Sequence, residues 1–315
     1  MIRSHIVLGI FVVGFMFSAR SFADVSAEEL KIQFPSQFHS LLQSGVGKIH
    51  YQDTGEAGRP VVVLVHGVSG PMFVWDKNIV SLQNAGFRVI RLDLMGRGFS
   101  DRLDASNYGL DLYVQELEVL LAGLSVKGPF FIVGSSLGAI ISTEFTIRHP
   151  QSVLGIILIG PAGFPISVPI IAKLRDVPVL GDVLFWAFGK STIEKQNKKY
   201  FVDERPPPEF WDYFTAQLSV SGTAEAMRKT MANAPVQSFV ASYEQLGRLG
   251  MPVGVIWGNK DVTFPYENHK TLISAIPRAK LVTIDNSGHI PQYERSAETN
   301  QALTELLNGF RGRSQ

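Results

Sequence analysis

Two serines stand between two glycines in the segment GSSLG at residues 134–138. An apolar run precedes this segment, and a helical pattern over residues 137–149 follows it. A G-x-S-x-G motif between a strand and a helix is typical of a nucleophile elbow, a sharp turn that exposes its central serine. The flanking glycines leave room where the strand and helix backbones pass close together. The pattern predicts that Ser136 is a nucleophile at the carboxyl end of a sheet.

A serine hydroxyl needs a base to take its proton, and the base needs an acidic partner that fixes its tautomer. Asp261, in "VIWGNKDVTFP", comes just after an apolar strand pattern. His289, in "VTIDNSGHIPQYE", lies in the loop after the following strand. We therefore expect Ser136, Asp261 and His289 to act together, with His289 as the base and Asp261 as its partner.

The order Ser, Asp, His along the chain is that of the α/β-hydrolase triad, and the sequence resembles the α/β-hydrolase superfamily over nearly all of its length after the leader. The segments "LVHGVSG" and "RLDLMGRGFSDR" follow two early strands, at the places where that family carries such motifs. The resemblance implies a strand-built core, a serine nucleophile and hydrolytic chemistry.

Four other residues compete for these roles or lie beside them. Asp285 belongs to the end of the last strand, and the turn after "VIWG" favours Asp261 over it as the acid. Asp93 is expected to organise its own loop through hydrogen bonds. His66 is expected to hold its loop through the imidazole, and His149 to end a helix before Pro150.

Acyl transfer needs hydrogen-bond donors aimed at the developing oxyanion. The elbow supplies the backbone N–H of Leu137, at the start of a helix whose dipole favours negative charge. By the family pattern, the second donor is the N–H of the residue after His66-Gly67, which is Val68. An apolar side chain is compatible with that role because only the backbone acts.

Short apolar runs bounded by Gly, Pro, Asp or His alternate with amphipathic segments such as residues 111–124. This alternation predicts an α/β fold with a doubly wound, mostly parallel sheet and right-handed crossovers. Residues 38–53 are expected to form a leading hairpin with its turn near residues 44–47. The predicted strands are 61–65, 87–92, 130–133, 153–159, 253–257 and 281–284.

The alternation stops over residues 163–236, which contain Pro-rich stretches and helical patterns but no clear strand. A connection of this length is too long for an ordinary loop, so we interpret it as an inserted helical cap. Its residues 164–188 are unusually apolar. Most of these side chains are expected to dock the cap on the core, and the others to line an acyl pocket, with Phe164, Phe185 and Trp186 as the predicted substrate contacts.

Residues 1–23 read as a secretory signal peptide, with Arg3 and His5 before an apolar stretch and a small-x-small pattern ending at Ala23. An uncleaved anchor is the alternative, but the apolar run is shorter than the roughly 20 residues that span a bilayer. The expected location is periplasmic or secreted. The expected organisation is a hydrolase core in two parts, residues 24–162 and 237–315, on either side of the cap.

Composition narrows the possible partners. The net charge is +1, charged residues make up 18% of the chain and no basic block occurs, so a nucleic-acid partner is not expected. The chain has no cysteine, which excludes disulfides and thiolate metal sites, and no metal-binding or cofactor motif is present. We expect no cofactor, a small ester or lipid-like substrate, and transient contact of the cap with a membrane surface.

A serine at the nucleophile position supports acyl-enzyme chemistry, so the predicted reaction is the hydrolysis of short-to-medium-chain carboxylic esters. Hydrolysis of a carbon–carbon bond in a vinylogous diketone uses the same three residues and is the enzymatic alternative. A hydrolase-like protein that only binds an apolar ligand is the third possibility. Turnover of an activated ester separates this third possibility from the two enzymes, and cleavage of a dienol-ketone separates the enzymes from each other.

Overall fold

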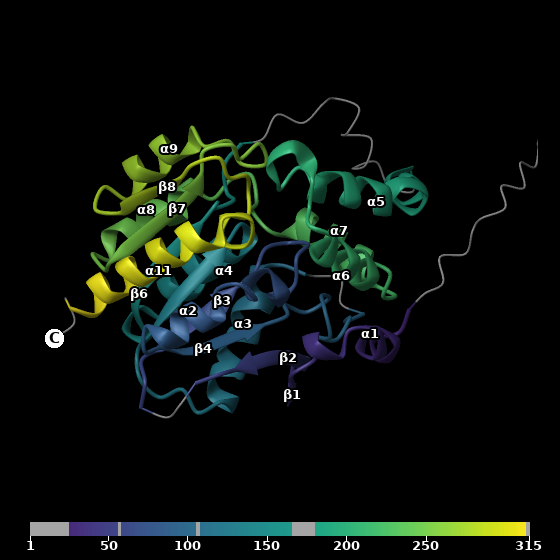
Figure 1. Cartoon of the computed structure of the whole chain (residues 1–315), viewed down its shortest axis with the longest axis horizontal. Helices are drawn as coiled ribbons and strands as arrows, with labels where there is room; N and C mark the ends of the chain where they lie inside the picture. Colours follow the sequence, from purple (N-terminus) through teal and green to yellow (C-terminus); the bar gives the residue numbers. More distant parts are fainter. Residues whose placement is uncertain (1–24, 56–57, 105–107, 166–179, 313–315) are drawn as a thin grey trace, which may run out of the picture.

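A single twisted sheet organises the molecule (Figure 1). The computed structural model describes residues 25–55, 58–104, 108–165 and 180–312, and for residues 180–188 it describes the backbone only. The described residues form an eight-stranded sheet of order β1-β2-β4-β3-β5-β6-β7-β8. The strands are β1 (Ser40–Ser44), β2 (Gly47–Asp53), β3 (Val61–Val65), β4 (Arg88–Leu92), β5 (Phe130–Ser135), β6 (Val153–Ile159), β7 (Val253–Gly258) and β8 (Lys280–Ile284).

Strand directions divide the sheet into a hairpin edge and a parallel core. The predicted hairpin is present, since β1 pairs antiparallel with β2 from Ser44 opposite Gly47 to Ser40 opposite Tyr51. The contact of β2 with β4 is also antiparallel, and the strands from β4 to β8 are parallel. The predicted doubly wound, mostly parallel sheet is confirmed. The interior strands β5 and β7 are buried along their whole length, as expected for strands covered on both faces.

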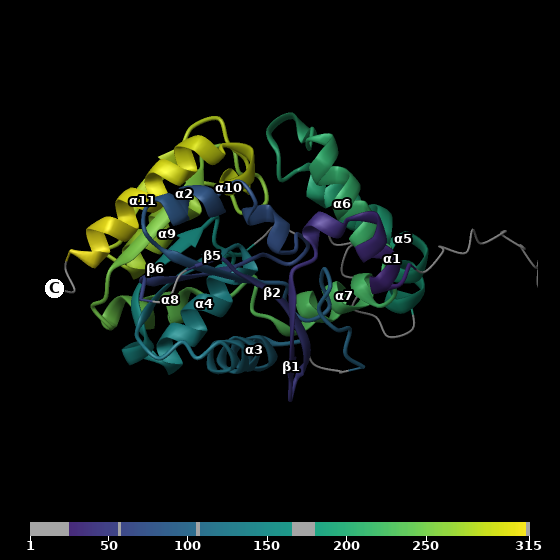
Figure 2. The same ribbon diagram turned by 60° about the horizontal axis from the view of Figure 1, so that its bottom comes forward.

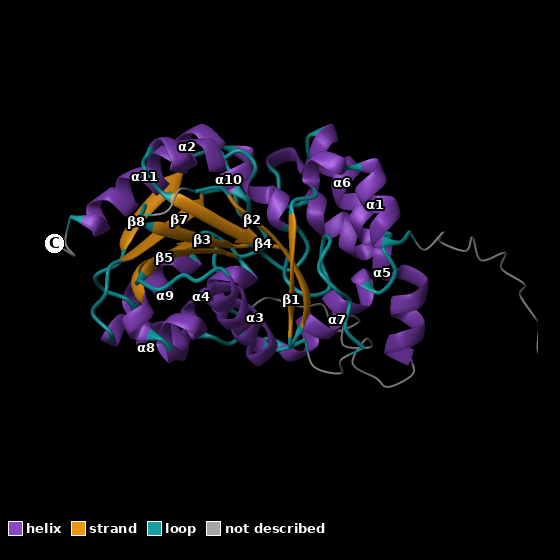
Figure 3. Ribbon diagram, turned by 90° about the horizontal axis from the view of Figure 1, so that it is seen from below, coloured by secondary structure: helices purple, strands orange, loops and turns teal. Residues whose placement is uncertain are grey.

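Helices cover both faces of the sheet, as Figures 2 and 3 show. One face carries α3 (Leu110–Gly123), α4 (Leu137–Arg148), α8 (Val240–Arg248) and α9 (Asn268–Ala275), and the other carries α2 (Ile79–Asn84) and α11 (Ser296–Arg311). Two clusters of buried apolar side chains result, one on each face. Crossovers of one hand place successive helices on one face until the chain reverses direction across the sheet.

Three further helices stand beyond one end of the sheet (Figure 1). They are α5 (Leu180–Lys198), α6 (Pro208–Leu218) and α7 (Thr223–Asn233), and they lie between β6 and α8 in the chain. We refer to them and the turns between them as the cap. A short helix, α10 (Pro291–Glu294), follows the β8 loop.

The start of the described chain, at Val25, is hydrogen-bonded to the cap. Val25 pairs with Val220 in a parallel bridge, and its N–H and C=O bond to Ser219 and Ser221. The helix α1 (Ala27–Gln33) then begins at a capping box formed by Ser26 and Glu29. The predicted signal peptide, residues 1–23, lies outside the described residues. Within the described part of the chain, no helix combines the length and apolar character needed to cross a membrane.

Candidate active site

The loop between β5 and α4 is a strained turn. Ser136 has φ 57° and ψ −116°, a left-handed conformation that a residue with a side chain rarely adopts. The glycines explain how the turn fits: a Cβ on Gly134 would lie 2.2 Å from the carbonyl oxygen of Gly138, and a Cβ on Gly138 would lie 2.2 Å from that of Val65. The strand and helix therefore pack too closely for any side chain at either position, as a nucleophile elbow requires.

A second loop, after β7, holds a buried carboxylate. Asp261 Oδ1 accepts the backbone N–H groups of Thr263 (2.8 Å) and Phe264 (3.0 Å). Its Oδ2 accepts the indole N–H of Trp257 (3.2 Å) and lies 2.8 Å from His289 Nδ1. Four donors therefore fix the carboxylate, and the structure brings Asp261 and His289 together as the sequence predicted.

The tautomer of His289 follows from this contact. An aspartate carboxylate only accepts hydrogen bonds, so the proton between the two groups belongs to Nδ1. The other ring nitrogen, Nε2, is buried and has no hydrogen-bond partner among the described residues. His289 therefore presents an unpaired acceptor nitrogen, which is the form of imidazole that can take a proton from a hydroxyl.

One bend of the chain joins Ser136 to the Asp–His pair. The backbone N–H of Ser136 donates to Ile159 at the end of β6 (2.9 Å), and its carbonyl accepts the N–H of Ala162 (3.3 Å). Between these two contacts lies Gly160, where an added Cβ would be 3.3 Å from His289 Nδ1 and 3.4 Å from Asp261 Oδ2. No hydrogen bond joins the Ser136 hydroxyl to His289 in this structure, as is common for catalytic pairs without substrate.

The two predicted oxyanion donors belong to segments that adjoin Ser136. Leu137 is the first residue of α4, so its N–H has no partner within the helix. The loop after β3 approaches from the other side: a Cβ on Gly67 would lie 3.1 Å from Ser136 Cβ and 3.6 Å from Ser136 Oγ. Val68 follows directly, and the arrangement can offer two backbone N–H groups to an oxygen on a serine adduct.

Arg97, in the "RLDLMGRGFSDR" segment, is hydrogen-bonded to the loop that carries Val68. Its Nε–H donates to the Val68 carbonyl (2.9 Å), and Nη1 donates to Met95 O (2.9 Å) and to Tyr113 OH (2.6 Å). Nη2 donates to Thr230 Oγ1 in the cap (2.8 Å). Arg97 is fully buried, and its role is visible only once the fold brings these segments together.

His66 and Asp93 take the structural roles that the sequence predicted. His66 Nε2 accepts the N–H of Leu94 (2.8 Å), and Nδ1 donates to the neighbouring carbonyl of Gly67 (2.7 Å). Burial lowers the pKa of His66 to about 4, which keeps it neutral and suited to this tautomer.

Asp93 binds His50 Nδ1 (2.7 Å) and accepts the N–H groups of Met72 (2.8 Å) and Phe99 (3.0 Å). Burial by itself would raise the pKa of Asp93, but His50 and the hydrogen bonds outweigh it and hold that pKa well below its usual range.

The other competing residues lie apart from the pair. Asp285 is exposed and accepts a hydrogen bond from Asn259 (2.8 Å). His149 follows the last residue of α4, as predicted, and contacts Glu118. Glu294 in α10, which the sequence did not single out, accepts the N–H of Gly288 (2.6 Å) and so fixes the loop that carries His289.

The three predicted substrate contacts have different outcomes. Phe164 is 1% exposed, and its ring packs against Tyr243 and Trp257 at centroid distances of 5.8 and 5.9 Å. It therefore lies in the core on the α8 side of the sheet. The side chains of Phe185 and Trp186 lie outside the described residues, although both belong to α5. Roles of all three in substrate binding stay predictions.

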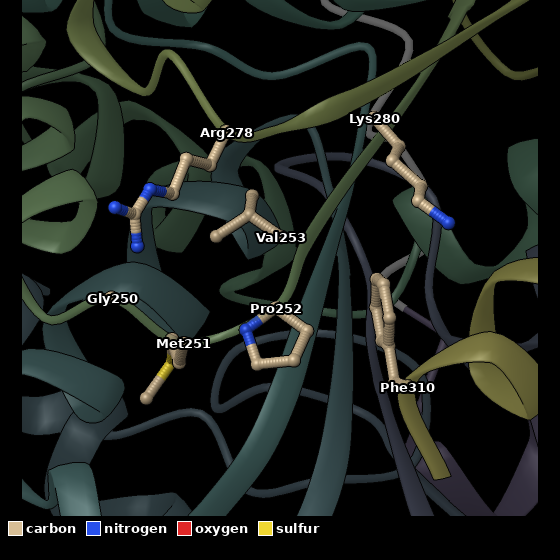
Figure 4. Close-up of a pocket in the computed structure, with 7 residues that line it drawn as sticks. All are labelled: Gly250, Met251, Pro252, Val253, Arg278, Lys280 and Phe310. Atoms are coloured by element: carbon tan, nitrogen blue, oxygen red, sulfur yellow. The ribbon is translucent and has the colours of Figure 1, made fainter. Parts of the chain in front are cut away.

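A pocket of about 250 Å³ lies at the opposite end of the strands (Figure 4). It includes Val253 and Lys280, the first residues of β7 and β8, whereas Asp261 and His289 follow the carboxyl ends of these strands. Ligands of open α/β sheets bind at the carboxyl ends, so this pocket is not part of the candidate site. Within the described ranges, no group of three or more His, Cys, Asp or Glu side chains is arranged to hold a metal ion.

Comparison with known proteins agrees with this geometry. The model of the alpha/beta hydrolase fold family matches residues 60–296, and the chain belongs to this family. The family resemblance noted in the sequence is therefore confirmed, and with it the assignment to the hydrolases.

The curated relatives at this level of similarity include carbon–carbon bond hydrolases. A 2-hydroxy-6-oxononadienedioate/2-hydroxy-6-oxononatrienedioate hydrolase of Paraburkholderia phymatum is 26% identical over 289 residues, covering 86% of this chain and 95% of the relative. A similarly described hydrolase of Pseudomonas putida is 26% identical over 267 residues, covering 82% of this chain and 91% of the relative.

Solved structures show the same fold with other activities. One is described among the carboxylesterases of Nitrososphaera gargenis, with a TM-score of 0.70, 23% identity, and coverage of 87% of this chain and 100% of that one. Another is a putative lipase from Acinetobacter baumannii, with a TM-score of 0.72, 20% identity, and coverage of 92% and 98%. At these identities the likeness establishes the fold alone.

Proposed function

We propose that this chain is an exported serine hydrolase that cleaves carboxylic esters of short-to-medium acyl chains. The observation that carries the proposal is the buried Asp261–His289 pair, with Nδ1 held at 2.8 Å and Nε2 unpaired, beside a serine on a strained elbow. A base, its orienting carboxylate and a nucleophile are what acyl-enzyme chemistry requires.

The mechanism follows from these groups. Ser136 Oγ attacks the ester carbonyl while His289 Nε2 takes its proton, and Asp261 stabilises the resulting imidazolium. The N–H groups of Val68 and Leu137 bind the oxyanion of the tetrahedral intermediate. His289 then returns the proton to the departing alcohol. A water molecule, deprotonated by His289, attacks the acyl-enzyme in the same way and releases the acid.

Fluorophosphonate labelling combined with ester turnover tests this proposal. We expect Ser136→Ala to abolish both the labelling and the hydrolysis of p-nitrophenyl esters. Ser135→Ala is the matched control, because the Ser135 hydroxyl accepts a hydrogen bond from Gln292 (3.0 Å) and its variant keeps the nucleophile. Labelling that persists in Ser136→Ala would refute the assignment of the nucleophile.

Carbon–carbon bond hydrolysis is the second candidate, because the curated relatives are described as hydrolases of a dienedioate. A dianionic substrate calls for cations that are free to bind its carboxylates. Arg97 is the buried cation that contacts the Val68 loop, and its four hydrogen bonds go to protein oxygens. Arg97 is therefore not free to bind a substrate carboxylate, which supports the ester proposal as far as this residue is concerned. Cleavage of a dienol-ketone at a higher kcat/KM than any ester would favour the second candidate.

Export is the part of the proposal that rests on residues 1–23 alone. If the leader is removed after Ala23, the exported protein begins at Asp24. This start would place the new terminus next to Val25, which is bonded to the cap. N-terminal sequencing of the exported protein checks the prediction, and retention of Met1 would indicate an anchor.

A further inference from the structure

Side chains of the cap form hydrogen bonds with Ser69, the residue that follows the proposed oxyanion donor Val68. The Ser69 hydroxyl donates to Asn197 Oδ1 (2.9 Å) and is hydrogen-bonded to the hydroxyl of Tyr200 (3.1 Å). The Ser69 carbonyl accepts the side-chain amide of Gln217 (3.2 Å). Ser69, Asn197 and Gln217 are all at most 3% exposed. The position of the Val68–Ser69 backbone is therefore determined partly by the cap.

The direction of these hydrogen bonds is fixed. Asn197 Nδ2 donates to the carbonyl of Ile193 (2.8 Å), so its Oδ1 faces Ser69 as an acceptor. The single hydroxyl proton of Ser69 goes to that oxygen, and Ser69 Oγ must accept from Tyr200. Burial raises the pKa of Tyr200, which keeps its hydroxyl protonated and able to donate. The chain of donors runs from Tyr200 through Ser69 to Asn197.

The same tyrosine also holds the loop of the general base. The Tyr200 carbonyl accepts the backbone N–H of His289 (2.8 Å), and its ring lies 4.9 Å from the imidazole, centroid to centroid. The contact is close, since a Cβ on Gly288 would be 2.3 Å from the Tyr200 carbonyl oxygen. One cap residue therefore contacts both the oxyanion loop and the base.

We propose that Tyr200 is a positioning residue that sets the distance between the backbone N–H of Val68 and the imidazole of His289, acting on the first through the hydroxyl of Ser69. The inference rests on the proposed function of this site. It makes the cap part of the catalytic framework as well as a cover for the substrate. Loss of the Tyr200 hydroxyl should loosen an oxyanion donor, and this affects the transition state more than the bound ester.

Tyr200→Phe tests this role, because it removes the hydroxyl and keeps the ring beside His289. Removing one oxyanion donor outright typically costs about 10²–10³ in rate, so a loosened donor is expected to cost roughly 10-fold in kcat with KM nearly unchanged. The rate is measured per active site, counted by titration with a fluorophosphonate. A purely structural role would lower the number of titrated sites and leave kcat per site unchanged, which would overturn the proposal.

Tyr266→Phe is the matched control, since the Tyr266 hydroxyl bonds to Thr283 and to no residue of the site. Its kcat per site should equal that of the parent. The path through Ser69 is tested by combining Ser69→Ala with Tyr200→Phe. If the tyrosine acts through the serine, the double variant loses no more than the larger single loss, and multiplying losses would overturn this path.

Failure of the two proposals can be told apart. A parent protein that neither turns over esters nor reacts with the fluorophosphonate contradicts the proposed function. A parent that does both, with a Tyr200→Phe variant equal to it in kcat per site, contradicts only the role of Tyr200.

Discussion

Gly138 lies so close to Val65 that a Cβ on the glycine would come within 2.2 Å of the valine carbonyl oxygen. This contact joins the first turn of α4 to the end of β3, so it sets how near the loop of Ser136 approaches the loop of Val68. The atoms nearest to such a Cβ are the backbone carbonyl oxygens of Val65 and His66. Backbone atoms cannot move out of the way by a side-chain rotation.

We expect Gly138→Ala to destabilise the protein by at least about 2 kcal/mol, because the added methyl group forces the strand and helix apart. Urea unfolding measures the change. Gly309→Ala is the control: Gly309 lies within α11, where an added Cβ meets only Lys280 Nζ at 3.9 Å. That variant should gain roughly 0.5–1 kcal/mol, the usual advantage of Ala over Gly in a helix. Equal stability of the Gly138→Ala variant and the parent would contradict the close packing.

Asp261→Asn should lower kcat strongly, because an asparagine amide can donate to Nδ1 and favour the wrong tautomer of His289. The same change in a well-studied serine protease costs about 10⁴-fold. Asp285→Asn should change kcat little, since Asp285 is exposed and bonds to Asn259. Steady-state kinetics of both variants on one ester decide the matter, and the reverse ranking would mean that Asp285 is the acid.

Glu116 predicts a pH dependence of stability. Burial raises its pKa from 4.5 to about 8, and one carboxyl oxygen has no partner among the described residues. The folded state binds this proton more tightly than the unfolded state. The resulting stability is fully present below about pH 4.5 and is lost as the pH rises through 8.

We therefore expect Glu116→Gln, which resembles the protonated form, to gain stability relative to the parent between pH 5 and pH 8, by at most about 4 kcal/mol. Urea unfolding at both pH values measures the difference. Glu305→Gln on the exposed side of α11 should show no such gain. A constant difference between Glu116→Gln and the parent across this range would show that Glu116 is charged in the folded protein.

Acyl-chain preference tests the role of the apolar residues 164–188. Each buried methylene contributes roughly 0.8 kcal/mol, so kcat/KM for p-nitrophenyl esters should rise from acetate to about hexanoate or octanoate. Trp186→Ala should flatten this rise more than it lowers the acetate rate. A steady decline from acetate onward would assign the apolar residues to packing alone.

The sequence predicted the elements that local pattern controls. Apolar, β-branched runs bounded by turn residues located β3 and β6 at their observed bounds, since such a pattern suits strands buried on both faces. The order of the site residues located Asp261 beside His289, because the carboxyl ends of neighbouring parallel strands meet at one edge.

Contacts between residues far apart in the sequence could not be predicted from local sequence patterns. Ser69 and Tyr200 are 131 residues apart, and nothing in either segment indicates that they bond. Similarly, an apolar residue such as Phe164 signals burial without indicating its neighbours. The fold places it against Tyr243 and Trp257.

The loop that carries His289 has a consequence for the timing of synthesis. Its anchors come from far back in the chain: Glu294 Oε1 accepts the N–H of Val202, 92 residues earlier, and Asn78 donates to the carbonyl of Gln292 across 214 residues. The ribosome makes Ser136 well before it makes this loop. In any folding intermediate in which the loop has not yet docked, Ser136 therefore stands without His289, and the proposed hydrolytic activity begins only when the last segment is in place.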